Sequence, residues 1–466
     1  MEYGEYSTFN MIRTQDFYLV PLCLIVLMFF IRSMYMRYRD TPIQRYILPA
    51  FTLRIVGAIV YTMVIHYYYG FGDSHNYYQG VLDLHHAVSD DASFLKDIYG
   101  KLKLERTDRI FPYFYYDGYG VSQYYMQEVR TYNVSRFALP FSLLFNKSFL
   151  CISFCISFLS FHGSWRIFKM FYEMYPTIHK KIALATLFLP SLLFWGTSLL
   201  KDPICVAALG YFTYACYSAL IKKKNITSSI IIIILSGLVL NNLKPYILLC
   251  MSAVFMLWVF LRVRDKIEDK TMRIVSTSFF VAAAMAVGFF LSNSLADSEA
   301  SQFSSDKLLG TVQKQQAIFG NASDEEGGGG GSKFSVAKAE SPLQLAASFP
   351  IGIVNTFFRP FPWDVRSPVA ILSALEAFAF LALTWMCFRR LGIKQTFNIM
   401  FSEPVIAFCF IFAILFGGII GLTTTNFGAL SRYKIPCIPF YAMAFILIMH
   451  RSGKFNQPFI FSKRLF

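Results

Sequence analysis

The sequence contains a long series of apolar blocks that carry almost no charge. Runs such as Ile230–Leu240 and Phe408–Ile420 are continuous and do not alternate with polar residues. A membrane-spanning helix needs about 20 apolar residues in a row, whereas a strand of a membrane barrel alternates over about 10. Only 15% of the residues are charged, against about 25% in soluble proteins. The sequence therefore predicts an all-α integral membrane protein and excludes soluble enzymes, disordered chains and disulfide scaffolds.

The uncharged blocks predict about eleven transmembrane helices. They lie at 17–31, 47–70, 148–165, 182–200, 204–221, 226–242, 245–261, 274–292, 367–388, 404–422 and 435–449. Several are short, and 182–221 allows a hairpin of tilted or re-entrant helices. The segment 341–358 is also uncharged, but Pro342 and Pro350 interrupt it. We expect it to lie at the membrane interface or to dip into the protein, and whether it spans the membrane is left open.

The net charge of +15 comes largely from short basic clusters between the blocks. The clusters are Arg32, Arg37, Arg39 and Arg45; Arg166, Lys169, Lys180 and Lys181; Lys222–Lys224; Arg262, Arg264, Lys266, Lys270 and Arg273; Arg389, Arg390 and Lys394; and Arg451, Lys454, Lys463 and Arg464. Cytoplasmic loops are enriched in Lys and Arg. With eleven spans, every cluster falls on one side, which predicts a bacterial inner-membrane protein with its N-terminus outside and its C-terminus in the cytoplasm. The basic charge then reflects topology and does not indicate nucleic acid.

Two long segments are expected outside the cytoplasm within a single polytopic domain, 1–466. Residues 71–147 are polar and rich in tyrosine, which predicts interfacial helices because tyrosine favours the headgroup level. Residues 293–358 hold the glycine run Gly327–Gly331, which has the features of a flexible linker and not of a phosphate loop. The nine cysteines lie inside apolar blocks and are interpreted as small buried hydrophobic residues.

Polar residues that need an explanation gather on the predicted outer side. Ionisable groups in or beside the membrane are costly and usually face a cavity or pathway. A single Lys or Arg at a span end more often extends to the lipid headgroups. Here, however, each short outer turn carries at least one cation beside Pro, Asp or an aromatic residue. The sequence thus leaves two interpretations, a shared anion site or independent lipid anchors. The residues concerned are Asp73, Lys201, Asp202, Lys244, Arg359, Trp363, Asp364 and Arg432.

One carboxylate and several cations in a membrane cavity suit a lipid-linked phosphosugar. Lysine and arginine would hold the phosphate as the leaving group, and Asp73 would take the proton of the attacking hydroxyl. The candidate catalytic residue is Asp73, and the candidate substrate-binding residues are Tyr77, Tyr78, Lys201, Asp202, Lys244, Arg359, Trp363, Asp364 and Arg432. A divalent metal at His75, His85 and His86 is left open, but their loose spacing favours solvated loop histidines. No residue is assigned as a metal ligand.

Several short motifs occur in order along the chain. They are Gly-Asp-Ser-x-x-Tyr-Tyr at 72–78, Pro-Ser-x-x-Phe-Trp at 190–195 with Lys-Asp at 201–202, Lys-Pro-Tyr at 244–246, Arg-Pro-Phe-Pro-Trp-Asp at 359–364 and Arg-Tyr-Lys-Ile-Pro at 432–436. Together they resemble bacterial polytopic proteins grouped near the GT-C glycosyltransferases. The resemblance implies that Asp73 is the catalytic carboxylate of the first outer loop and that Arg432 contacts the phosphate.

The resemblance implies an enzyme that takes a sugar from a polyprenyl-phosphate-linked donor to a glycan or lipid acceptor at the outer face of the membrane, in the assembly of envelope polysaccharide or glycolipid. Two alternatives remain, a polysaccharide polymerase of O-antigen or capsule type and a flippase or transporter of lipid-linked oligosaccharide. The inner halves of the predicted spans carry almost no charge apart from Arg54. This favours a one-sided site. The expected partners are the lipid-linked sugar, its acceptor and membrane lipid, with no nucleic acid and no cofactor assigned.

Overall fold

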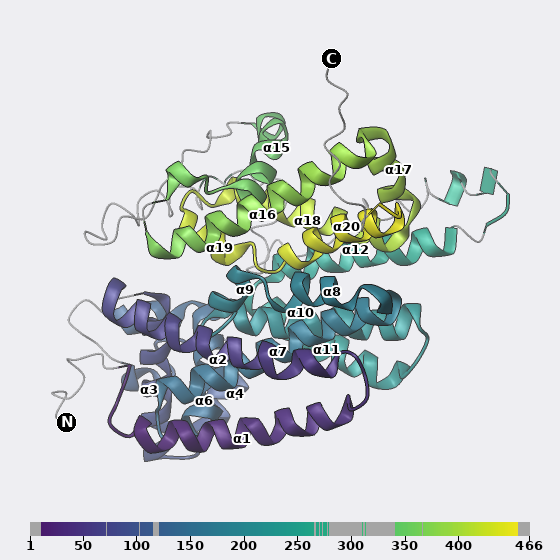
Figure 1. Cartoon of the computed structure of the whole chain (residues 1–466). Helices are drawn as coiled ribbons and strands as arrows, with labels where there is room; N and C mark the ends of the chain where they lie inside the picture. The colour runs from purple at the N-terminus through teal and green to yellow at the C-terminus, as the bar shows by residue number, and fades with distance from the viewer. Residues whose placement is uncertain are drawn as a thin grey trace. The chain divides into compact units, whose positions relative to one another are not determined.

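The computed structural model describes residues 11–264 and 341–454 apart from 71, 102, 115–120 and 366, together with scattered residues between 267 and 313 (Figure 1). All regular elements in these ranges are helical, with no β-strand. The glycine run at 327–331 and most of the span expected at 274–292 lie outside the described residues. The chain divides into two compact units, which are treated separately below.

The first unit comprises mainly Met1–Leu249 together with Ser431–Pro436. Its helices are α1 (Asp16–Arg37), α2 (Ile47–Met63, continued by a π-helical turn over Val64–Tyr69), α3 (Asp73–Asp90), α4 (Phe94–Gly100), α5 (Val121–Gln127), α6 (Val129–Leu144), α7 (Phe149–Met174), α8 (His179–Leu187), α9 (Pro190–Phe194), α10 (Lys201–Cys216, continued by a π-helical turn over Tyr217–Ile221) and α11 (Ile226–Leu243). Helix α12 (Pro245–Arg264) begins at the end of this unit.

The second unit contains the remaining described helices. They are α15 (Pro342–Phe358), α16 (Pro368–Leu391), α17 (Ile393–Ser402), α18 (Pro404–Thr423) and α20 (Ile438–Arg451), and α19 (Phe427–Tyr433) begins here and ends in the first unit. Helix α15, expected at the interface or dipping into the protein, packs against α18 within this unit. A Cβ atom at Gly421 would lie only 1.9 Å from the Gly352 carbonyl oxygen, so this packing requires glycine.

Eight helices in the described part of the chain are long and apolar enough to cross a membrane, or nine if the bent pair α19 and α20, with 65° between its halves, counts as one span. The eight coincide with the predicted blocks at 17–31, 47–70, 148–165, 204–221, 226–242, 245–261, 367–388 and 404–422. The predicted all-α architecture, with several helices able to cross a membrane, is confirmed for the described residues. The count of eleven spans stays a prediction.

The block expected at 182–200 differs from a continuous span. It forms the short helices α8 and α9, followed by non-helical residues up to Lys201. Its start and end nevertheless lie at opposite ends of the first unit, since His179 contacts Tyr46 at the beginning of α2 and Leu199 contacts Ser74 at the beginning of α3. The segment therefore crosses the first unit as a broken helix.

The first three basic clusters meet at one end of the first unit. Arg45 contacts His179, and both Lys169 and Lys222 form ion pairs with Glu173 at the end of α7. The opposite end carries the start of α3 and the start of α10. Residues of the first three basic clusters therefore lie at one end of this unit, and the starts of α3 and α10 lie at the other, as the predicted order of turns requires.

Close helix packing in the first unit depends on glycine. Helices α7 and α10 approach at Gly163 and Gly210, where a Cβ atom on Gly210 would lie 1.9 Å from the Gly163 carbonyl oxygen. Small residues allow this approach between apolar helices, which otherwise have little hydrophobic reason to associate in lipid. The contact sets the position of α10, whose first residues take part in the site described below.

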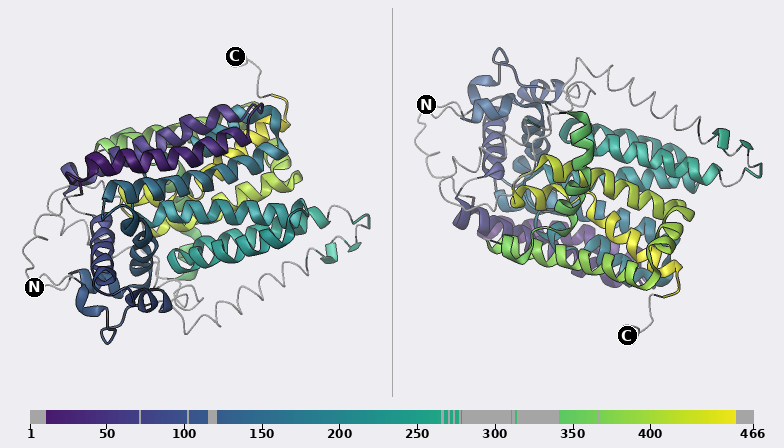
Figure 2. Two further views of the ribbon diagram at one scale, coloured as in Figure 1. Left: turned by 90° about the horizontal axis from the view of Figure 1, so that it is seen from below. Right: turned by 90° about the horizontal axis from the view of Figure 1, so that it is seen from above.

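The long segment 71–147 folds into α3, α4, α5 and α6 at one end of the long helices of the first unit, where the blue helices run across them in Figure 2. These helices enclose a small hydrophobic core that includes Leu84, Ile98, Tyr132 and Leu139. Buried Arg136 donates hydrogen bonds to the carbonyls of Ile98 and Lys101 and so closes the loop after α4. The expected helices are present, and their location in the membrane interface stays a prediction.

Candidate functional site

A polar pocket of about 180 Å³ lies in the first unit, among the ends of its helices. Its lining residues are Asp73, Asn76, Tyr77, Tyr125, Glu128, Thr131, Lys201, Lys244, Arg432 and Tyr433. Pockets for drug-sized ligands usually occupy about 300–1,000 Å³. The size therefore suits one charged headgroup more than a complete lipid-linked sugar.

Local structure at helix ends supplies the charged side chains. Asp73 is the first residue of α3, four residues after the π-helical end of α2, and Lys201 and Asp202 begin α10. Lys244 directly follows α11, where Pro245 starts the next helix. Arg432 lies in the last turn of α19, before the bend to α20. Residues at the ends of apolar helices meet where those helices end, and this brings together positions far apart in the sequence.

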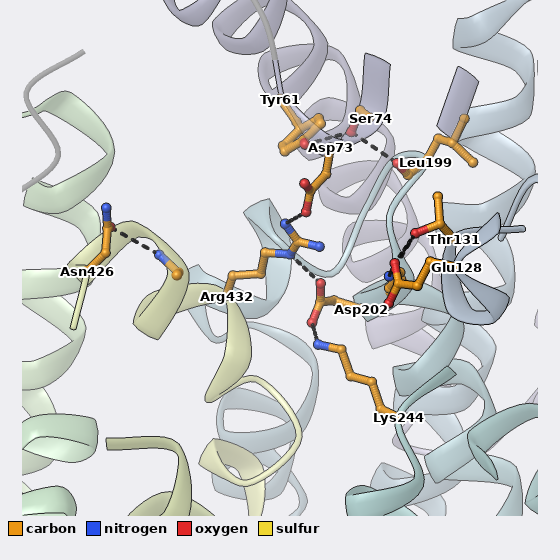
Figure 3. Close-up of polar contacts among 12 residues, drawn as sticks. Tyr61, Asp73, Ser74, Glu128, Thr131, Leu199, Asp202, Lys244, Asn426 and Arg432 are labelled. Atoms are coloured by element: carbon orange, nitrogen blue, oxygen red, sulfur yellow. Dashed lines mark hydrogen bonds and ion pairs between the residues drawn. The ribbon is translucent and has the colours of Figure 1, made fainter. Parts of the chain in front are cut away.

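Four of the charged side chains form a continuous series of ion pairs. Arg432 Nη1 donates to Asp73 Oδ2 at 2.6 Å, and Arg432 Nε donates to Asp202 Oδ2. Lys244 Nζ donates to the other oxygen of Asp202, Oδ1, at 2.5 Å. Figure 3 shows Arg432 between the two aspartates, with Lys244 beyond Asp202. One guanidinium group therefore joins the start of α3 to the start of α10.

A second polar group lies beside this series. Lys201 Nζ is 3.4 Å from Glu128 Oε2 and 3.3 Å from Thr131 Oγ1. Thr131 also donates to the same Glu128 oxygen, which fixes the carboxylate at the start of α6. The Lys201 ammonium lies 5.6 Å from the centre of the Tyr77 ring. Lys201 is therefore held by α3 and α6 but still lines the pocket.

The charged groups differ in burial: some form the buried floor of the pocket, and others lie at its solvent-exposed rim. The side chain of Asp202 is 1% exposed and that of Lys244 is 7% exposed, whereas those of Asp73 and Glu128 are 48% and 50% exposed. Three cations, Lys201, Lys244 and Arg432, face three carboxylates, so the formal charges cancel. An anionic ligand would have to displace the exposed carboxylates from Arg432 and Lys201, because the Asp202–Lys244 pair is closed to solvent.

The Asp73 carboxyl is ionised beside Arg432. Removal of water around it acts to raise its pKa, but the Arg432 guanidinium, with help from Lys201, outweighs that effect and holds the pKa below its usual value. Asp73 is therefore a carboxylate at neutral pH and a weaker base than an isolated aspartate. Its proton affinity depends on what else Arg432 binds.

Tyrosine rings form the remaining walls. Lys244 Nζ lies 4.2 Å from the centre of the Tyr433 ring, a distance typical of a cation–π contact. Tyr77 is 3% exposed, and burial followed by the nearby Asp73 charge raises the pKa of its phenol well above the usual value. Tyr77 therefore stays a neutral hydrogen-bonding group.

The candidate residues identified from the sequence do not all lie together. Asp73, Tyr77, Lys201, Lys244 and Arg432 line the pocket, and Asp202 lies beneath them. Tyr78 does not line it, because the ring packs on Phe149 and the hydroxyl donates to the Lys147 carbonyl.

Arg359, Trp363 and Asp364 belong to the second unit. Arg359 forms a salt bridge of 3.0 Å with Asp364, which also accepts from the Phe361 amide and so closes this turn. Trp363 is 78% exposed and stacks on Phe361. None of the three lines the pocket of the first unit.

The histidines considered for a metal have other surroundings. His75 and His85 are buried, and loss of solvation is the main reason that the pKa of each falls to about 4. His85 contacts Ser142, and His86 lies 3.7 Å from Asp90 on the same helix. Among the described residues no three His, Cys, Asp or Glu side chains are grouped to hold an ion.

Five lining residues were missed by the candidate selection: Asn76, Tyr125, Glu128, Thr131 and Tyr433. Asn76 and Tyr433 lie within the motifs at 72–78 and 432–436, so the motifs could have indicated that they lie near Asp73 and Arg432. Glu128 and Thr131 are about 70 residues from Lys201 and belong to the long segment 71–147. No local pattern indicates that they contact it.

Comparison with known proteins assigns no family or function to the chain. No family model, no curated protein and no solved structure matches the chain. What the protein does must therefore be argued from the pocket itself.

Proposed function

We propose that the protein is a membrane glycosyltransferase of GT-C type. It would transfer a sugar from a polyprenyl-phosphate-linked donor to a glycan or lipid acceptor, in assembly of envelope polysaccharide or glycolipid. The site would face the outside of the bacterial inner membrane, with the N-terminus outside and the C-terminus in the cytoplasm. The observation that carries the proposal is the 2.6 Å contact between Asp73 and Arg432 in one pocket, which supplies a proton acceptor and a phosphate ligand side by side.

The two more open cations would hold the donor phosphate. Arginine binds phosphate oxygens through a planar fork of donors, and lysine adds a point charge. Asp202 would keep the Arg432 side chain in place through Nε, since that carboxylate is buried and also bound to Lys244. Phosphate would displace Asp73 from Arg432 and Glu128 from Lys201, and the two half-exposed carboxylates would then turn toward solvent.

The transfer step follows from these positions. The acceptor oxygen forms a bond to the anomeric carbon while the bond from that carbon to the phosphate oxygen breaks. The bonding pair leaves with the polyprenyl phosphate, whose negative charge Arg432 and Lys201 stabilise. The proton of the acceptor hydroxyl passes to Asp73, released from Arg432 by the donor. Tyr125 and Tyr433, which line the pocket and are partly exposed, offer ring surface to the sugar.

Donor binding should change the pH profile of the reaction. In the free protein Arg432 lowers the pKa of Asp73, so the acid limb of kcat/KM should lie below about pH 4, the range of an unperturbed aspartate. A phosphate on Arg432 adds negative charge near Asp73, so the acid limb of kcat should lie at higher pH. Rates at a series of pH values with saturating and limiting donor measure both limbs. Coincident limbs would contradict the exchange of partners at Arg432.

Replacement of Arg432 tests the phosphate contact. Arg432→Lys keeps the charge but loses the forked donor, and Arg432→Ala loses both. We expect the donor KM to rise about 10–100-fold in the alanine variant, and less in the lysine variant, because a hydrogen bond to a charged group contributes about 1.5–3 kcal/mol. The acceptor KM should change little. The matched control is Arg109→Ala, an exposed arginine of the same outer segment that pairs with Asp91.

Equal increases in donor and acceptor KM for Arg432→Ala would assign that residue to structure alone. The lipid-linked products that accumulate in a deletion strain, measured by mass spectrometry, separate the proposal from its alternatives. A transferase leaves a lipid-linked acceptor short of one sugar. A polymerase leaves complete repeat units unjoined, and a flippase leaves complete units on the cytoplasmic side.

A further inference from the structure

The residues between α9 and α10 form the non-helical end of the segment that crosses the first unit. Residues 194–200 are all buried. Non-helical backbone at membrane depth is tolerated only where protein groups satisfy its N–H and C=O groups, since no water is present to do so. We call this segment, Trp195–Leu200, the crossing loop.

Side chains from three helices satisfy the crossing loop. Ser198 has a positive φ of 67°, its amide donates to Ser157 Oγ at 3.1 Å, and its hydroxyl contacts Ser153. The Leu199 carbonyl accepts from Ser74 Oγ at 3.0 Å, as Figure 3 shows. The amides of Trp195 and Gly196 still donate to the Ser191 and Leu192 carbonyls of α9, whereas Ser198 and Leu199 are held by side chains of other helices.

Arg54 of α2 provides a further set of contacts to the loop. Arg54 Nη1 donates to the Gly196 carbonyl and to Ser160 Oγ, both at 2.8 Å, and Nη2 donates to Ser164 Oγ at 2.7 Å. Ser160 also donates to the Gly196 carbonyl at 2.7 Å. The guanidinium is 1% exposed, and within the described ranges its hydrogen bonds go to hydroxyls and a carbonyl, with no carboxylate.

The crossing loop connects the two sides of the pocket. Its C-terminal end leads directly into Lys201 and Asp202. The Leu199 contact reaches Ser74, the residue after Asp73, and Tyr61 OH holds the same Ser74 hydroxyl at 2.8 Å. The position of the loop therefore sets the position of the start of α10 relative to the start of α3, and thus of Lys201 and Asp202 relative to Asp73.

We propose that Arg54 is a positioning residue for the pocket. It holds the crossing loop through Gly196, and the loop in turn holds Lys201 and Asp202 at the distances required to place Arg432 and an anionic headgroup. A costly buried charge is retained because no neutral side chain of α2 offers this many donors to one carbonyl and two hydroxyls at once. The inference rests on the proposed function only in the identity of the bound anion. The contacts of Arg54 with the loop do not depend on that function.

The test compares Arg54→Met, Arg54→Lys and the double variant Ser160→Ala/Ser164→Ala with the full-length wild-type protein in lipid nanodiscs. The hydrogen-exchange rate of peptides covering 195–202 measures how firmly the loop is held. Calorimetric titration with inorganic pyrophosphate measures the affinity of the pocket for an anion. We expect Arg54→Met to accelerate exchange in 195–202 by about tenfold or more and to weaken pyrophosphate binding by a similar factor. Arg54→Lys should recover most of both effects, and the serine double variant should shift both in the same direction as Arg54→Met.

Thr213→Val is the matched control, because Thr213 is a buried hydroxyl that bonds only within α10, to the Leu209 carbonyl. It should leave both readouts unchanged. Wild-type exchange rates over 195–202 in both Arg54→Met and the serine double variant would overturn the proposal. Faster exchange spread evenly over α2, α7 and α10, without recovery in Arg54→Lys, would also overturn it. Absence of pyrophosphate binding to the wild-type protein counts against the proposed function, while exchange still decides the role of Arg54.

Discussion

Replacement of Asp73 with asparagine is expected to reduce sugar transfer by about 10²–10⁴-fold, the usual contribution of a positioned general base. Asparagine has nearly the same shape and its carbonyl oxygen can still accept from Arg432 Nη1, so the pocket should keep its geometry. It cannot take the proton of the acceptor hydroxyl. The rate should be measured as transfer of labelled sugar from a polyprenyl-phosphate donor by purified protein, together with the amount of folded protein in the membrane.

The matched control for this experiment is Asp90→Asn, at the other end of α3, where Asp90 lies near His86. Its transfer rate should remain at the wild-type level. Donor binding by Asp73→Asn should be unchanged or tighter, since the asparagine competes less with phosphate for Arg432. Full transfer by Asp73→Asn would remove Asp73 as the base.

Replacement of Asp202 with asparagine is expected to cause the largest loss of stability. Asp202 accepts from both Lys244 and Arg432, and all three side chains are largely buried. Removal of one member of a buried ion pair costs about 3–5 kcal/mol, because the remaining charge loses its partner in a medium that solvates it poorly. Here two cations lose the same partner. The sequence motif indicates a substrate contact for Asp202, whereas its burial favours a supporting role.

The control is to compare the stability of Asp202→Asn with that of Lys244→Met and of the double variant. Lys244→Met leaves Asp202 paired with Arg432 and should cost less than Asp202→Asn. The double variant Asp202→Asn/Lys244→Met removes one charge of each sign and should be more stable than Asp202→Asn alone. Thermal unfolding can be followed with a thiol-reactive dye, because eight of the nine free cysteines are buried. An Asp202→Asn protein at least as stable as Lys244→Met would show that the buried pairs are not coupled.

The helices of the first unit illustrate how far the sequence alone leads. Blocks such as 17–31 and 226–242 could be predicted as helices, because in lipid a helix is the only segment that satisfies all of its own backbone groups. The block at 182–200 has a similar apolar composition but forms α8, α9 and the crossing loop. It can do so only because Arg54 and the serines of α7 supply hydrogen bonds, and these partners lie far away in the sequence.

The candidate site divides in the same way. Asp73, Lys201, Lys244 and Arg432 could be identified because each is a charged residue at an end of an apolar helix, and such ends meet at one level. Arg359 and Asp364 satisfy the same criterion, yet they pair with each other in the second unit. Tyr78 belongs to the same sequence motif as Asp73 and Tyr77, yet its ring packs on Phe149 away from the pocket. Glu128, opposite Lys201, has no local signal.

The sequence by itself determined that the chain is an all-helical membrane protein, where most of its long helices run, and which turns carry unusual charge. These properties follow from apolar length and from the cost of charge in lipid, both of which are local. Only the tertiary structure decided which charges share a pocket, that Asp202 and Lys244 form its buried base, and why Arg54 is retained inside a span. Those properties depend on hydrogen bonds between residues tens to hundreds of positions apart, which no local pattern encodes.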